Sequence, residues 1–199
     1  MSDGGGTLRG MTSALSWLEA PRPTPVAAVL PTASGLAGER FDGLLGATPG
    51  GGLAPVDVLA GAAGRAGALR DAVPSWAALA RCTAVWVHTG RLCPERAEVV
   101  VHPGRRLHAG AVVHRQLLEE GDVVLLGGVA TTTPLRTAVD LLCFAEEHLA
   151  VTRVCALVLG GLPPSLVRDA LGRPGRRAPV RRATALLTVA EDAARRRRP

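Results

Sequence analysis

A helix start near the middle of the chain places the strongest constraint on its fold. Residues 127–142 read Gly-Gly-Val-Ala-Thr-Thr-Thr-Pro-Leu-Arg-Thr-Ala-Val-Asp-Leu-Leu, which is typical of a strand end, a tight turn and a capped helix. Thr133 can cap the helix by accepting a hydrogen bond from a free backbone N–H of the first turn. Pro134 suits the first helical position, because its φ is already helical and no N–H is needed there. The segment therefore predicts a helix that begins at Pro134.

Apolar residues follow Pro134 at spacings of three and four, and so form one stripe on this helix: Leu135, Ala138, Val139, Leu142, Ala145 and Leu149. The opposite side carries polar residues, among them Arg136 and Asp140. These two are four residues apart, so they can form an ion pair on the helix surface. Hydrophobic residues make up 47% of the chain and aromatic residues only 3%, which predicts a core of Leu, Val and Ala.

A small antiparallel sheet is expected upstream of this helix. Strands are predicted at 98–102, 111–117 and 122–126, and a short strand or bend after the glycine pair. The links between them leave no room for crossover helices, which favours antiparallel pairing. Before the strands, a helix that Pro74 opens and Gly90 ends with a left-handed cap should place one face in the core, namely Trp76, Leu79, Ala80, Thr83, Trp86 and Val87.

The remaining segments complete an α+β fold. Further helices are expected at 151–159, 165–171 and 183–194, and a weaker one at 56–69. The four glycines and the proline of residues 46–52 indicate a loop. We therefore predict a sheet of three or four antiparallel strands flanked by helices, within three segments: a flexible, Gly/Pro/Ala-rich N-terminal segment at 1–55, the α+β domain at 56–192 and a basic tail at 193–199.

Positive charge is concentrated at the C-terminal end of the chain. The net charge is +6, and residues 153–199 alone hold 11 arginines against 3 acids. All 23 basic residues are arginine, which is typical of a GC-rich genome and is no sign of selection for arginine geometry. Such a run can neutralise phosphates and so favours electrostatic contact with DNA, although a solvated tail is equally consistent with it. The candidate DNA-binding residues are Arg173, Arg176, Arg177, Arg181, Arg182, Arg195, Arg196, Arg197 and Arg198.

Motifs of catalysis and metal binding are absent from the sequence. There is no Gly-x-Ser-x-Gly elbow and no Gly-Lys-Ser/Thr phosphate loop. His102 and His114 could face each other across two strands, but no Cys or carboxylate cluster has metal-ligand spacing. An enzymatic site around these histidines is the least favoured hypothesis. The glycine turn and the helix start at Thr133 could hold an anion, but a well-capped helix is favoured. We expect a non-enzymatic protein with no metal and no cofactor.

Cysteine usage and hydropathy indicate a cytoplasmic protein. None of the four cysteines is in a Cys-x-x-Cys pair, which predicts reduced thiols, at least two of them buried on helices. No stretch approaches the length of a membrane span, and the N-terminus does not resemble a signal peptide.

The helix-start segment resembles the signature of the AbiEi-family antitoxins of type IV toxin–antitoxin systems, Gly-Gly-Val-x-Thr-Thr-Pro-x-Arg-Thr-Ala-x-Asp-Leu. The resemblance extends to Thr83–Gly90, which is similar to the family's Thr-Ala-Ala-Trp-x-His-Gly helix end, and to the three predicted strands. It covers roughly residues 76–192. The residues that match the family motif, and that should mostly hold the fold together, are Trp86, Thr132, Thr133, Pro134, Arg136, Thr137 and Asp140.

The resemblance implies a non-enzymatic antitoxin that represses its own operon and opposes a nucleotidyltransferase-type toxin. Many members bind their promoter through an N-terminal winged helix, but residues 1–70 contain no capped basic recognition helix. A longer form of the family continues into a nuclease-like domain beyond the position of Asp192. The alternative expectation is therefore a truncated relative of this nuclease-linked form, acting as a protein-interaction module.

Overall fold

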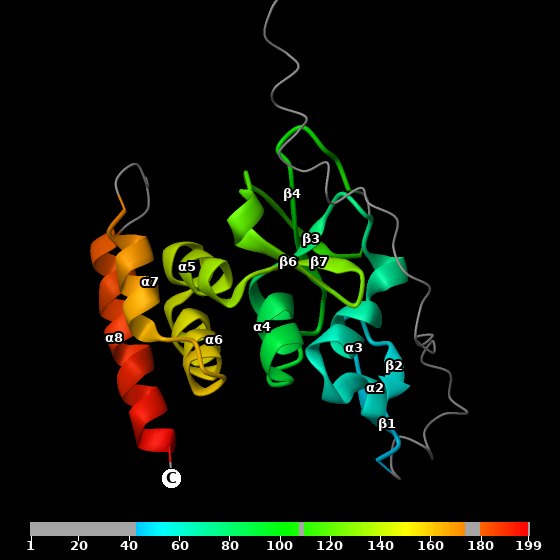
Figure 1. Ribbon diagram of the computed structural model, residues 1–199, viewed down its shortest axis with the longest axis horizontal. Helices are drawn as coiled ribbons and strands as arrows, with labels where there is room; N and C mark the ends of the chain where they lie inside the picture. The colour runs from blue at the N-terminus through cyan, green and yellow to red at the C-terminus, as the bar shows by residue number, and fades with distance from the viewer. Residues whose placement is uncertain (1–42, 108–109, 174–179, 199) are drawn as a thin grey trace, which may run out of the picture.

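The chain folds into a sheet region and a bundle of helices, which meet at one shared helix (Figure 1). The computed structural model describes residues 43–107, 110–173 and 180–198. These residues form helices and two β-sheets, so the predicted α+β class is confirmed. The predicted flexible segment lies outside the described residues up to position 42.

The main sheet has five strands in the order β5-β4-β3-β7-β6. The β3–β4 and β6–β7 pairs are antiparallel, whereas β3–β7 and β4–β5 are parallel. The prediction of a purely antiparallel sheet of three or four strands is therefore wrong in direction and in strand number. The five strands are β3 (Ala78–Leu79), β4 (Glu98–Val101), β5 (Val112–Arg115), β6 (Val123–Leu126) and β7 (Val129–Thr132).

Two local features explain the difference. After β4 the chain returns to the end of the sheet at which β4 begins, so that Glu98 pairs with Val112 in parallel register. Residues 78–79, expected inside a helix, form the central strand β3 and are fully buried. Tertiary pairing thus overrides the helical periodicity before residue 81.

Helix α4 (Arg81–Thr89) is shared by the two hydrophobic cores. Cys82 and Val85 belong to the core of the helix bundle, whereas Trp86 and Val87 belong to the core under the sheet. The prediction that Trp86 is a core residue is confirmed, because it is almost completely buried. Gly90, at φ +69°, ends the helix as the predicted left-handed cap, and its N–H donates to Trp86 O.

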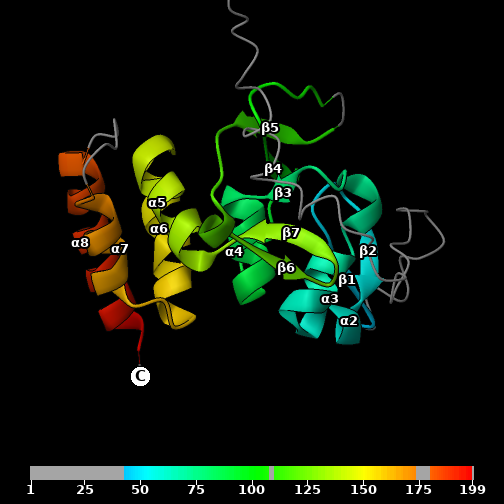
Figure 2. The same cartoon turned by 45° about the horizontal axis from the view of Figure 1, so that its top comes forward.

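The bundle consists of four helices on one side of α4 (Figures 1 and 2). The predicted apolar stripe continues through Ala145 to Leu149, whereas helix α5 ends at Phe144. The helix stops there because the backbone of Ala145 is extended and the Glu146 carboxylate caps the next helix. The last helix continues to Arg197, so three arginines of the predicted tail are helical. The four helices are α5 (Pro134–Phe144), α6 (Glu147–Leu159), α7 (Pro164–Leu171) and α8 (Val180–Arg197).

The other side of the sheet region carries a hairpin and short helices (Figure 2). Residues 46–52, expected as a loop, include part of strand β1 (Leu45–Ala47), which pairs with β2 (Leu53–Pro55). The predicted helix at 56–69 is split at Gly61. The short helices in the sheet region are α2 (Val56–Ala60), α3 (Ala62–Gly67) and the 3-10 turns η3 (Arg70–Ala72) and η4 (Glu120–Asp122).

Buried Arg65 fastens these short helices to α4. Its Nε donates to Val87 O at 2.9 Å, and its Nη1 donates to Leu59 O and Ala60 O at 2.7 and 2.9 Å. All three acceptors are carbonyls near helix ends, where the helix leaves them without intrahelical partners. Burial lowers the pKa of Arg65. Arg65 is thus part of the packing between the short helices and α4.

The turn between β6 and β7 packs directly on α3, and this contact generates a stability prediction. Gly127 has φ +54°, and a Cβ at this position would lie 2.1 Å from the backbone oxygen of Ala63. We expect Gly127→Ala to lower the free energy of unfolding by about 3–4 kcal/mol, since left-handed strain and overpacking add. Urea unfolding measures the loss.

Gly50→Ala is the matched control, because Gly50 also has positive φ but its Cβ would meet no atom within 4 Å. Gly50→Ala should lower the free energy of unfolding by only about 1–2 kcal/mol, because it adds left-handed backbone strain without overpacking. Equal losses in the two variants would contradict close packing of this turn on α3.

Candidate functional site

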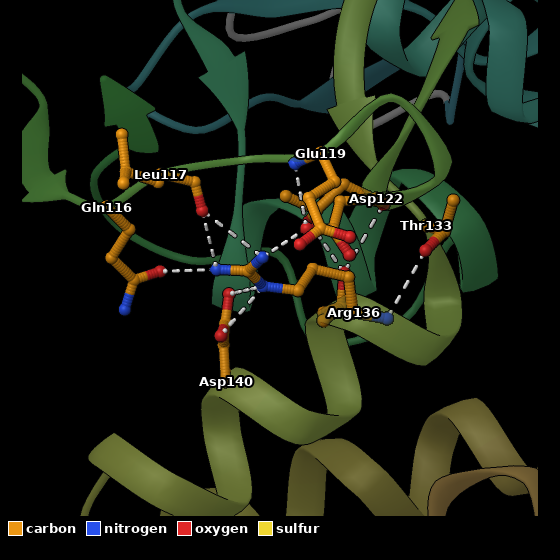
Figure 3. A network of polar contacts seen from close by, with 9 residues as sticks. Gln116, Leu117, Glu119, Asp122, Thr133, Arg136 and Asp140 are labelled. Carbon is orange, nitrogen blue, oxygen red and sulfur yellow. Dashed lines mark hydrogen bonds and ion pairs between the residues drawn. The ribbon is translucent and has the colours of Figure 1, made fainter. Parts of the chain in front are cut away.

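The helix start at Thr133 and Pro134 forms a capped corner between β7 and α5 (Figure 3). The Arg136 N–H donates to Thr133 Oγ1 at 3.2 Å, and Pro134 occupies the first turn, as predicted. The glycine turn and the helix start do not converge into an anion site, because strand β7 separates Gly128 from Thr133. The cap satisfies a backbone donor of the first turn within the fold itself.

The Arg136 guanidinium is the centre of a polar network at this corner (Figure 3). Its Nε donates to both carboxylate oxygens of Asp140, at 3.0 and 2.9 Å. Its Nη1 forms an ion pair with Asp122, and its Nη2 donates to Gln116 Oε1 at 3.2 Å. Both terminal nitrogens also lie 3.4 Å from Leu117 O. One side chain therefore connects α5 to the segment between β5 and β6.

The Arg136–Asp140 pair forms as predicted, but it is not on the helix surface. The side chains of Arg136 and Asp140 are only 11% and 2% exposed. The buried Arg136 guanidinium is disfavoured by desolvation, but the charges and hydrogen bonds of Asp140 and Asp122 outweigh this and raise its pKa. The pair is a buried, multiply bonded contact between elements.

Buried threonines complete the corner. Thr132 Oγ1 and Thr137 Oγ1 lie 2.7 Å apart, and neither residue is exposed. The ring Nε2 of His88 donates to Thr132 O at 2.8 Å, which links the end of α4 to the end of β7. Burial lowers the pKa of His88, so its neutral form is favoured. The structure brings these motif residues together at the corner, while Trp86 lies on the sheet-facing side of α4.

A second polar cluster, which no sequence motif predicts, lies where α4 begins. His114 Nε2 is 2.8 Å from Glu98 Oε2 across the β4–β5 pair. Although burial opposes it, hydrogen bonds from His114 and Cys82 lower the pKa of Glu98. Burial, with the Glu98 hydrogen bond, raises the pKa of Cys82 to about 12, so the thiol stays protonated. Only the parallel register of β4 and β5 creates this cluster.

The predicted opposition of His102 and His114 does not occur. His114 pairs in register with Val100, and His102 Nδ1 accepts the Gly104 N–H at 3.1 Å in the following turn. Within residues 43–107, 110–173 and 180–198, no three His, Cys, Asp or Glu residues could hold a metal ion. Cys82, Cys143 and Cys155 are buried on helices and take part in no disulfide within the described residues, as predicted.

The C-terminal arginines divide into engaged and exposed side chains. Arg182 donates to Ala145 O at 2.9 Å beyond the end of α5 and pairs with Glu147. Arg195 pairs with Asp192 and Glu191, and Arg197 lies 4.0 Å from the Cys155 sulfur. Arg176 and Arg177 lie outside the described residues. The exposed side chains with no ion pair in the described part of the chain are Arg173, Arg181, Arg196 and Arg198.

Helix α8 arranges part of this charge along one face. At about 100° per residue, one stripe of the helix contains Arg181, Ala185, Thr188, Asp192 and Arg196. Arg181 and Arg196 are therefore separated by about 22 Å along the axis at 1.5 Å per residue. Both side chains are exposed, and α8 itself lies at the outer edge of the bundle (Figures 1 and 2). The predicted basic surface is a line with charge at both ends.

Comparisons with protein-family models, with curated proteins and with solved structures found no match for this chain. Among the helices of the described residues, none combines the length and the apolar character needed to cross a membrane.

The Arg136 network generates a stability prediction. Arg136→Met should lower the free energy of unfolding by about 3–5 kcal/mol, because it leaves the carboxylate of Asp140 buried and unpaired. Arg136→Met combined with Asp140→Leu should recover most of this loss, since no buried charge remains at the pair. Urea unfolding of both variants tests the prediction.

Arg195→Ala is the control, because Arg195 makes surface ion pairs and is 70% exposed. It should change stability by less than about 1 kcal/mol. A double variant as unstable as Arg136→Met alone would show that lost packing, and not an unpaired charge, causes the effect.

The burial of His88 predicts a pH dependence of stability. The unfolded chain binds a proton near the ordinary pKa of 6.5, whereas the folded pKa is lower. This contribution to stability is complete above pH 6.5 and is lost as the pH falls through the folded pKa. Between pH 7 and 5, the wild type should therefore lose more unfolding free energy than His88→Gln, whose amide can still donate to Thr132 O.

The comparison between pH 7 and pH 5 stays above the pH range in which Glu98 titrates, because the pKa of Glu98 is lowered. Parallel pH profiles of the wild type and His88→Gln would contradict a buried neutral imidazole at this position.

Proposed function

We propose that this protein is a non-enzymatic regulator of the antitoxin type, which contacts DNA through the exposed arginines of α8. The observation that carries the proposal is the solvent-facing stripe that begins at Arg181 and ends at Arg196. Its length of about 22 Å corresponds to six or seven phosphate steps of 3.4 Å along a duplex. Asp192 is the only acid on the stripe, and Arg195 pairs with it.

The resemblance of residues 76–192 to AbiEi-family antitoxins supports the regulatory part of the proposal. On this basis the protein acts in the cytoplasm against a nucleotidyltransferase-type toxin. Its DNA contact is mainly electrostatic, because arginine contacts with phosphates do not distinguish one base sequence from another. The motif residues around Arg136 act as the structural support of the bundle that carries α8.

Enzymatic activity is not part of the proposal. The Cys82 thiol is protonated at neutral pH, because its pKa is raised to about 12, and it therefore lacks the thiolate needed of a nucleophile. The carboxylates of Asp122 and Asp140 are engaged by Arg136. These groups are used in holding the fold.

Exposed apolar side chains on the bundle favour the alternative of a protein-interaction module. Phe144 is 54% exposed at the end of α5 beneath the guanidinium of Arg81, 5.6 Å from the ring centroid, and Val189 is 49% exposed on α8. Such residues at the surface of a bundle are typical of partner contacts when they form a continuous patch. This alternative predicts that loss of the α8 arginines leaves the biological effect unchanged.

The proposal is tested by fluorescence anisotropy with the gene's own upstream duplex and a shuffled duplex over a salt series. Arg181→Ala combined with Arg196→Ala should weaken binding and reduce the slope of log K against log salt by about 2, roughly 0.9 for each lost phosphate contact. Arg91→Glu is the matched control, because it changes the net charge equally at an exposed residue outside α8.

The outcomes separate the hypotheses. A preference for the native duplex near physiological salt would support a repressor. Equal binding to both duplexes that fades with salt and depends on the α8 pair would support electrostatic contact alone. Equal weakening by Arg91→Glu, or no binding at low salt, would contradict the assignment of DNA contact to α8 and favour the interaction module.

A further inference from the structure

The link between β4 and β5 contains a basic hollow that the proposed function does not use. The hollow measures about 600 Å³ and is lined by Pro103, Gly104, Arg106, Leu107 and Arg115. Its lining residues belong to the β4–β5 link and to the end of β5, and these segments lie away from α8 in the backbone views (Figures 1 and 2). It therefore represents a second concentration of positive charge, formed by other elements of the fold.

The parallel register of the sheet places the two lining arginines together. Arg115 is the last residue of β5 and pairs with Val101, the last residue of β4. The chain that leaves Val101 forms the turn at His102–Arg105, where the Arg105 N–H donates to His102 O at 2.9 Å, and then reaches Arg106. Both side chains thus come to the same end of the strand pair.

Among the described residues that line this hollow, none is negatively charged. Arg106 and Arg115 are exposed, and neither has an ion pair with a carboxylate in the described part of the chain. The nearest carboxylate on the neighbouring strand, Glu98, is bonded to His114. A concave surface with two such guanidinium groups attracts an anion, and planar guanidinium forks match the oxygens of a phosphate group.

An aromatic side chain holds a third arginine beside the hollow. The guanidinium of Arg105 lies 5.5 Å from the centroid of the Trp76 ring. This cation–π contact restrains Arg105 and keeps its charge near Arg106 at the surface. Arg105, Arg106 and Arg115 thus place three positively charged side chains at this end of the β4–β5 pair.

We propose that this hollow is a binding site for a phosphate group, with Arg106 and Arg115 as its direct ligands. The phosphate comes either from a nucleic acid backbone or from a small phosphorylated molecule, since both present the same oxygens to the two arginines. The site goes beyond the proposed function of α8 and does not require it, because it uses no residue of that helix.

The test compares Arg106→Ala combined with Arg115→Ala against Arg91→Glu, which changes the net charge by the same amount. One arm titrates sodium tripolyphosphate into the full-length protein by isothermal calorimetry. The other measures anisotropy of a labelled 16-base-pair duplex, both on a wild-type background and on the Arg181→Ala, Arg196→Ala background. Thermal unfolding confirms that each variant is folded, which is expected because the changed side chains are exposed.

We expect each lost arginine to raise the dissociation constant about tenfold, as is typical of one charge-assisted hydrogen bond. Loss confined to the tripolyphosphate arm identifies a small phosphorylated ligand. Loss in the duplex arm that persists without the α8 arginines identifies nucleic acid backbone. Failure of tripolyphosphate and duplex to bind the wild type, or an equal effect of Arg91→Glu, overturns the proposal, whatever the outcome for α8.

Discussion

The contact on which the architecture depends is the buried guanidinium of Arg136. It joins the first turns of α5 to the segment between β5 and β6, beside the backbone hydrogen bond that Thr133 N–H donates to Asp122 O. Desolvation of a guanidinium and a carboxylate is costly, and it is offset only where geometry and additional hydrogen bonds are good. Here one side chain bonds two carboxylates, an amide and a carbonyl. The bundle is therefore held at a fixed angle to the sheet by a polar contact with directional requirements, alongside the apolar packing of α4.

The same use of arginine recurs through the fold. Arg65 and Arg182 donate to carbonyls at helix ends, and Arg70 donates to Gly127 O in the β6–β7 turn. These carbonyls lack intrahelical or ladder partners, and a long side chain with several donors can satisfy them from a distance. In a chain whose only strong base is arginine, the formal charge thus overstates the basic surface. The arginines that remain exposed without carboxylate partners define where a polyanion can bind.

The sequence predicts the locally determined parts of this structure well. The Thr133 cap, the first-turn Pro134 and the left-handed Gly90 depend on neighbouring residues, and each is where its pattern indicates. Strand β3 and the parallel β4–β5 pair depend on register with distant strands, which periodicity over a short window does not contain. For the same reason the Glu98–His114 contact and the approach of Arg106 to Arg115 could not be predicted. The apolar stripe of α5 predicts that Asp140 lies on the polar side of the helix, but the stripe does not show that another segment covers that side. The predicted surface position of Asp140 is therefore wrong.

The two exposed sets of arginines differ in shape, and this difference has consequences for what they can bind. The stripe on α8 is convex and extended, and its two arginines are about 22 Å apart along the helix. Contact with a long polyanion through this stripe would therefore involve phosphates several steps apart and would weaken steeply as salt rises. The hollow beside β5 is concave, so two guanidinium groups can act on a single phosphate through directed hydrogen bonds, which salt weakens less than separated surface charges. A line of charge provides affinity without selecting a ligand, whereas converging donors favour one chemical group. On physical grounds the hollow is therefore the more selective of the two surfaces, although each presents two arginines.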